Sequence, residues 1–159
     1  MTVPMVMYDD EFQQITLVCD RLCRDSNARV VFVIDKNGQL IASSGETDRL
    51  DSTSLASLVA GEIAATGGLA KLIGEKDFSV LFHEGVRDNL HISIVASRVI
   101  LVVIFDKRSS LGLVRLRVKK CSEELSRIFD VLLRKSALPG AATPFAEITD
   151  EDIDNLFSE

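Results

Sequence analysis

Cysteine and histidine side chains are the first candidates for chemistry in this sequence. Cys19 and Cys23 are one helical turn apart, so their thiols could ligate a metal ion together. A closed site takes about four ligands, and with only two histidines, His83 and His91, a complete ligand set around these thiols is hard to find. Both histidines lie in strand-like sequence, with no nucleophile or carboxylate at a telling spacing. We therefore expect no metal and no cofactor, and we interpret the cysteines as reduced thiols of the core.

Two short motifs resemble parts of ligand-binding loops. Residues 61–71, GEIAATGGLAK, contain glycines and a lysine but lack the adjacent Gly-Lys-Ser/Thr of a phosphate loop, and they lie within a helical pattern. The chain is therefore not expected to be an enzyme that hydrolyses nucleotides. Residues 35–38, DKNG, could begin a calcium loop, but the later acidic ligands of an EF-hand are missing. A hairpin turn with positive φ at Asn37 and Gly38 is the better interpretation.

The elements that would position these residues follow from hydrophobic periodicity. Helical spacing, period-two alternation and one continuous apolar run predict the order α-β-β-α-β-β-β-α. The expected fold is an α+β sandwich with a five-stranded antiparallel sheet in the order 2-1-5-4-3. The expected helices cover residues 9–24, 52–74 and about 110–134, and Ser52 or Thr53 caps the second of them. Two of the expected strands surround the turn at 35–38, and the other three cover residues 78–84, 90–96 and 99–105.

The third expected strand, FSVLFHE, lies at an edge of this sheet. An apolar edge strand exposes unpaired backbone groups that can pair with another chain. Pairing with its own copy would extend the sheet across a two-fold axis and bring two second helices together. We therefore expect a homodimer with Val80, Leu81 and Phe82 at the interface.

The second helix has an unusual composition, because three glycines lie within it although each costs about 1 kcal/mol relative to alanine. At 100° per residue, large side chains fall on one arc, which is expected to pack on the sheet. Small residues fall on the opposite arc, where another backbone could approach closely. Close packing within one subunit is the alternative. The large arc holds Leu55, Leu58, Val59, Ile63, Leu69, Leu72 and Ile73, with Glu62 and Thr66 near its middle, and the small arc holds Ser57, Ala60, Gly61, Ala64, Gly67, Gly68 and Lys71.

Composition and charge narrow the class of protein. The 159 residues are 47% hydrophobic, typical of one soluble domain, which we place at residues 1–135. The longest strongly apolar run, residues 99–105, is too short to span a bilayer, and no basic region precedes an apolar one at the N-terminus. We expect a cytoplasmic protein without membrane insertion. Residues 1–135 carry equal numbers of basic and acidic residues, so nucleic acid and anionic lipid are poor candidates as partners.

Residues 136–159 are expected to form a linker and an acidic tail, which carries the whole net charge of -6. Thr149 and Asp152 approximate a capping box ahead of apolar residues at helical spacing. This pattern favours a short amphipathic helix that docks on a partner, and a merely solubilising tail is the alternative. The expected docking residues are Phe145, Ile148, Ile153, Leu156 and Phe157.

The sequence as a whole resembles bacterial proteins of the Roadblock/LC7 family. The segments that carry the resemblance are VVFVIDKNGQLIASSG, TSLASLVAGEIAATGGLAKLIGE, FHEG, SRVILVVIFDKRSSLGLVRLRVKK and the ending PFAEITDEDIDNLFSE. The resemblance implies a homodimer whose paired second helices form a platform for one small Ras-like GTPase in its GTP form. It further implies GTPase activation without an inserted arginine, a role in cell polarity and motility, enrichment at a cell pole, and a tail that assists nucleotide exchange. The implied GTPase-binding residues are Ala60, Gly61, Ala64, Gly67, Gly68, Lys71 and Lys120.

Other interpretations remain open at this stage. A non-catalytic dimeric scaffold that recruits a GTPase or a motor would need the same helix surface. A ligand-sensing domain of similar shape would need polar pocket residues, which the apolar pattern does not supply. The basic cluster of Arg115, Arg117, Lys119 and Lys120 could be a solvated helix face or a contact for an acidic surface. An arginine supplied to a GTPase can add about 10³ to 10⁵ in rate, but helical context disfavours deep insertion of Arg115 or Arg117.

Overall fold

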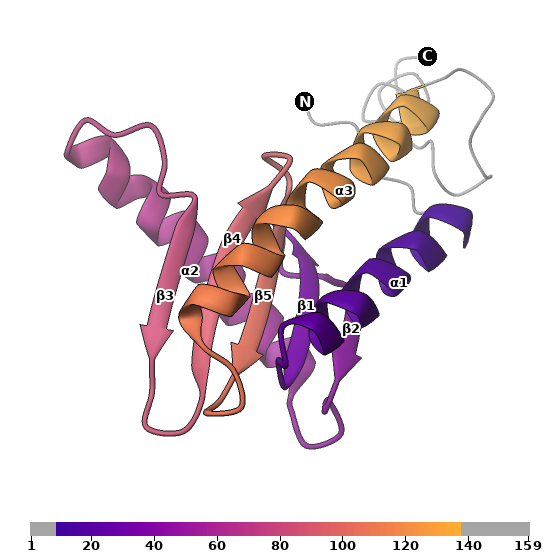
Figure 1. Cartoon of the computed structure of the whole chain (residues 1–159). Helices are drawn as coiled ribbons and strands as arrows, with labels where there is room; N and C mark the ends of the chain where they lie inside the picture. Colours follow the sequence, from indigo (N-terminus) through magenta and orange to yellow (C-terminus); the bar gives the residue numbers. More distant parts are fainter. Residues whose placement is uncertain (1–8, 138–159) are drawn as a thin grey trace, which may run out of the picture.

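The computed structural model describes residues 9–137, which form three helices and one five-stranded antiparallel sheet (Figure 1). The strand order is β2-β1-β5-β4-β3, so the predicted topology is confirmed. The tail residues expected to dock on a partner lie outside the described residues. The elements are α1 (Asp9–Asp25), β1 (Val30–Asp35), β2 (Leu40–Gly45), α2 (Ser52–Leu72), β3 (Val80–Glu84), β4 (Asn89–Val95), β5 (Val99–Phe105) and α3 (Leu111–Ala137).

The sheet separates two unequal helical layers (Figure 1). α1 and α3 together cover one face, joined by the ion pairs Arg21–Glu124 and Lys135–Glu11. α2 crosses the other face alone and makes only sparse contact with the sheet. The central strand β5 is buried along its whole length, as its unbroken apolar run predicts. α3 buries the predicted stripe of Val114, Val118, Cys121, Leu125, Ile128 and Leu132.

Two local predictions were wrong. The β1–β2 turn has positive φ at Gly38 but not at Asn37, because the connection is longer than two residues and only one left-handed residue is needed. Asp35 Oδ1 closes this turn by accepting hydrogen bonds from the backbone N–H groups of Asn37 and Gln39. The N-cap of α2 is Asp51, one residue before the expected Ser52, and its carboxylate accepts a hydrogen bond from the Ser54 N–H.

All three cysteines are free and buried, which confirms their interpretation as core thiols. Burial raises the pKa of the Cys19 thiol to about 12, so this sulfur stays protonated near neutral pH. Among residues 9–137, no cluster of three or more His, Cys, Asp or Glu side chains is placed to hold a metal ion.

A buried histidine predicts acid sensitivity of the fold. His91 on β4 is 2% exposed, and burial, together with Arg115 nearby, lowers its pKa. As pH falls below about 6.5, the unfolded chain gains a proton that the folded chain resists. Uptake of one full proton on unfolding would change the free energy of unfolding by ~1.4 kcal/mol per pH unit. Between pH 7 and pH 5 we expect the free energy of unfolding to fall with decreasing pH by less than this amount per pH unit. Urea denaturation at each pH measures this slope, and His91→Gln should flatten it.

His83→Gln is the matched control, because that ring is largely exposed on β3. If His83→Gln removed the slope and His91→Gln did not, the burial of His91 would not be its cause.

Candidate functional site

The outward side of α2 is apolar, and no other element of residues 9–137 covers it. Leu58 is 75% exposed, Leu69 54% and Leu72 85%. Small residues between them are exposed too, and a Cβ built on Gly61 or Gly68 would meet no atom within 4 Å. Large exposed apolar residues that gather on one side of an element are a mark of an interaction surface. We call this surface the open helix face: Leu58, Gly61, Ala64, Gly68, Leu69 and Leu72.

The predicted orientation of α2 is wrong by roughly a quarter of a turn. Ala56, Val59 and Ala60 pack on the sheet, and Ala60, expected on the partner-facing side, is only 8% exposed. Leu58, Leu69 and Leu72, expected on the sheet side, face outward. The physical reason is a close approach at the β1–β2 hairpin, where a Cβ on Gly38 would lie 3.1 Å from the Cα of Ser57 and 3.6 Å from the Cβ of Ala60. Only small side chains fit there.

Glu62 and Thr66, the polar residues that did not fit the predicted arc, are half-buried at the edge of the side of α2 that packs on the sheet. Glu62 pairs with His83 on β3, and Thr66 Oγ1 donates a hydrogen bond to the carbonyl of Glu62 within the helix. Their place near the middle of the predicted apolar arc is the signal in the sequence that a different side of α2 packs on the sheet. The Glu62–His83 pair joins α2 to β3 within one subunit.

The free edge of β3 lies beside α2. The bond from Ile94 N–H to the Ser79 carbonyl marks a hydrogen-bonded pair, so the alternation of an antiparallel ladder turns the backbone groups of Val80, Phe82 and Glu84 outward. Val80 is exposed, Leu81 and Phe82 are half-buried, and the Phe82 ring stacks on Phe105 with ring centroids 6.1 Å apart. The residues predicted for a dimer interface therefore form an unpaired, partly apolar strand edge.

The other residues predicted to bind a GTPase do not all join this surface. Gly67 is half-buried and Lys71 is exposed on α2. Lys120 is exposed on α3, across the sheet from α2, and lines a recess with Arg21 and Arg117. The open helix face and Lys120 therefore belong to opposite faces of the subunit.

Replacing a glycine of the open helix face by alanine should stabilise the fold. Gly61→Ala is expected to raise the free energy of unfolding by about 0.5–1 kcal/mol, because the added Cβ enters open space and alanine has the better helix propensity. Gly38→Ala is the matched control and should destabilise, since Gly38 has φ +90° and lies against α2. Urea denaturation measures both. A loss of stability in Gly61→Ala would show that this face is covered.

The composition of α2 also meets a simple criterion for membrane spans. Within residues 9–137 it is the one helix that is long and apolar enough, by length and composition, to cross a bilayer, and most of it is not buried in the subunit. One such helix is weak evidence, and insertion would pull Ala56, Val59 and Ala60 out of the core. The sparse burial of α2 reflects the same exposed leucines that form the open helix face.

The fold places the chain in the class of α+β sandwich domains, and residues 9–137 leave one helix face and one strand edge open. The model of the Roadblock/LC7 domain matches residues 14–105, and the chain belongs to the Roadblock/LC7 family. A sequence comparison with curated proteins returned no match.

Solved structures of MglB proteins are similar to this chain. Myxococcus xanthus MglB has 64% sequence identity and a TM-score of 0.76, over 80% of this chain and 96% of that one. The gliding protein MglB from Thermus thermophilus has 33% identity and a TM-score of 0.76, over 82% and 99% of the two chains. An MglB with a tetrameric arrangement has 32% identity and a TM-score of 0.76, over 83% and 99%. The chain is thus an MglB-like Roadblock protein.

Proposed function

We propose that this protein is a homodimeric activator of a small Ras-like GTPase of the MglA type. The observation that carries the proposal is the open helix face beside the unpaired edge of β3, in a chain 64% identical to an MglB. A solvent-exposed row of leucines is costly for a subunit that stays alone. When a second copy of the chain and a GTPase bind, the edge of β3 and the open helix face are both removed from solvent.

The dimer forms by pairing of β3 with the β3 of a second copy. Val80, Phe82 and Glu84 supply the outward backbone groups, and a two-fold axis makes the contact self-complementary. The same axis brings two copies of α2 side by side. Their open faces then form one platform, and because two symmetric sites on it overlap, one GTPase in its GTP form binds per dimer.

The activator supplies no arginine to the nucleotide. Arg115 and Arg117 belong to α3, which lies across the sheet from the open helix face. A GTPase docked on α2 is therefore separated from both guanidinium groups by the thickness of the subunit. Activation instead comes from holding the GTPase's own catalytic groups in the hydrolysing arrangement, a contribution of positioning and electrostatics.

The remaining parts of the proposal concern the tail and the cell. The C-terminal tail contacts the same GTPase through Phe145, Ile148, Ile153, Leu156 and Phe157, and it assists nucleotide exchange. The protein is cytoplasmic, is enriched at a cell pole, and controls polarity and motility through the GTPase. Protein contact accounts for the apolar surface of α2, so no membrane insertion is needed.

Single-turnover GTP hydrolysis by an MglA-type GTPase tests the function. Saturating protein should raise the rate by one to several orders of magnitude, as expected for stabilisation of a transition state. An unchanged rate despite complex formation would reject activation and identify the protein as a non-catalytic scaffold. The mass of the complex, measured in the same titration, should correspond to two copies of this chain and one GTPase.

A further inference from the structure

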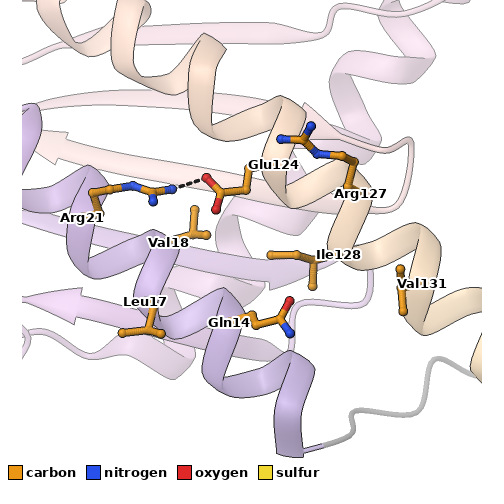
Figure 2. A pocket seen from close by; sticks show the side chains of 8 residues that line it. All are labelled: Gln14, Leu17, Val18, Arg21, Glu124, Arg127, Ile128 and Val131. Atoms are coloured by element: carbon orange, nitrogen blue, oxygen red, sulfur yellow. Dashed lines mark hydrogen bonds and ion pairs between the residues drawn. The ribbon is translucent and has the colours of Figure 1, made fainter.

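A groove runs between α1 and α3, on the side of the sheet away from the open helix face (Figure 2). Its volume is about 530 Å³, and apolar side chains from both helices line it, among them Leu17 and Val18 of α1 and Ile128 and Val131 of α3. Leu17 is 66% exposed and Val131 37%. Within residues 9–137, the groove therefore offers an apolar surface that no other element covers, and it is separate from the proposed dimer and GTPase sites.

The groove and the recess next to it carry an excess of positive charge. Four basic side chains line the two together, Arg21, Arg117, Lys120 and Arg127, against two acidic ones, Asp25 and Glu124. Only Arg21 among the four forms an ion pair within the described residues, with Glu124. Arg117 Nε is buried and has no hydrogen-bond partner among residues 9–137. An occupant that is both apolar and acidic would match this surface.

We propose that the C-terminal segment of this same chain, residues 138–159, binds in the α1–α3 groove. The segment contains six acidic residues and no basic one, and its apolar residues at helical spacing match the apolar lining of the groove. Residues 1–8 also lie outside the described range, but they contain no acidic residue and cannot match the basic side chains. Charge thus selects between the two ends of the chain.

The connection to α3 lets the segment reach the groove. α3 ends at Ala137, and the groove residues of this helix run from Glu124 to Val131, about 9 to 20 Å back along its axis at 1.5 Å per residue. Residues 138–144 can span up to about 23 Å when extended. Phe145 and the residues after it can therefore lie along the groove, and attachment to α3 gives them a high effective concentration there.

Occupation of the groove would control when the tail is available. A tail bound to its own subunit cannot contact a GTPase at the same time, so the two sites compete. This consequence rests on the proposed function, whereas binding of the tail to the groove does not. The experiment below contains no GTPase, so its result and that of the hydrolysis assay are independent.

Photo-crosslinking of the full chain tests the proposal. A photoreactive phenylalanine analogue replaces Val131, or Leu17 in a second variant, since both side chains are exposed and the fold should tolerate the change. Circular dichroism checks that each variant is folded. Mass spectrometry should find crosslinks to residues 145–157 of the same molecule, identified by mixing ¹⁴N and ¹⁵N protein. Crosslinks to residues 1–8, crosslinks to another copy, or none in both variants would overturn the proposal.

A charge reversal supplies the matched control. Arg127→Glu should lower the crosslink yield about three- to tenfold, because it removes an attraction for the acidic segment and adds a repulsion. Lys119→Glu makes the same change on the same helix at an exposed residue outside the groove, and it should leave the yield unchanged. Equal losses in the two variants would overturn the proposal, since net charge alone would then explain the binding.

Discussion

Ala64→Arg combined with Gly68→Arg is expected to abolish stimulation of GTP hydrolysis while the subunit stays folded. Both residues are exposed on α2, and a Cβ on Gly68 meets no atom within 4 Å. Two long, charged side chains would hold a partner's backbone away from the open helix face and would have to lose hydration on contact. We expect affinity for the GTPase to fall by at least about 100-fold, or ~2.7 kcal/mol. Binding titration and single-turnover hydrolysis measure both effects.

The same substitution one helical turn earlier is the control. Ala60 is 8% exposed and packs on the sheet, so Ala60→Arg should destabilise the fold instead of removing binding from a folded subunit. Urea denaturation separates the two outcomes. Full stimulation by the folded Ala64 and Gly68 double variant would show that the GTPase docks elsewhere and would refute the proposed platform.

Val80→Pro is expected to weaken the homodimer by at least about 30-fold, because proline removes an outward N–H from β3 and places a ring at the edge. Two-fold symmetry makes every change count twice, and two lost hydrogen bonds at about 1 kcal/mol each already account for this factor. The ladder to β4 should survive, since the N–H of Val80 points away from it. Sedimentation equilibrium over a range of concentrations measures the dissociation constant.

Ser43→Pro tests whether any edge proline has this effect. The bond from Glu46 N–H to the Arg29 carbonyl sets the alternation on β2, and it turns the N–H of Ser43 outward at the opposite edge of the sheet. This variant should remain dimeric. A dimer that survived Val80→Pro and dissociated in Ser43→Pro would place the interface on β2.

Much of the fold was predictable because its signals are local. The stripe of α3 and the continuous apolar run of β5 each identify an element and its buried side without reference to the rest of the chain. The sheet order followed from connection lengths, since hairpins join neighbours. Where a local signal was ambiguous, prediction failed, as at the β1–β2 turn, where Asn37 and Gly38 suited two kinds of connection.

The candidate site was predictable in its location and not in its orientation. α2 and the edge strand β3 were identified from glycine content and connectivity. The surface residues Leu58, Leu69 and Leu72 were missed, because a helix with apolar residues on most of its circumference does not determine which side meets the sheet. The burial of Ala60 places one predicted partner-binding residue in the core.

The sequence by itself determined the order of elements, the strand left at the edge, and the segregation of acidic charge into the last residues. These depend on periodicity and composition, which act over a few residues at a time. Only the tertiary structure decided the rotation of α2, the separation of Lys120 from the open helix face, and the groove between α1 and α3. The reason is steric: α2 turns its alanines toward the β1–β2 hairpin, because the backbone at Gly38 leaves no room there for a larger side chain.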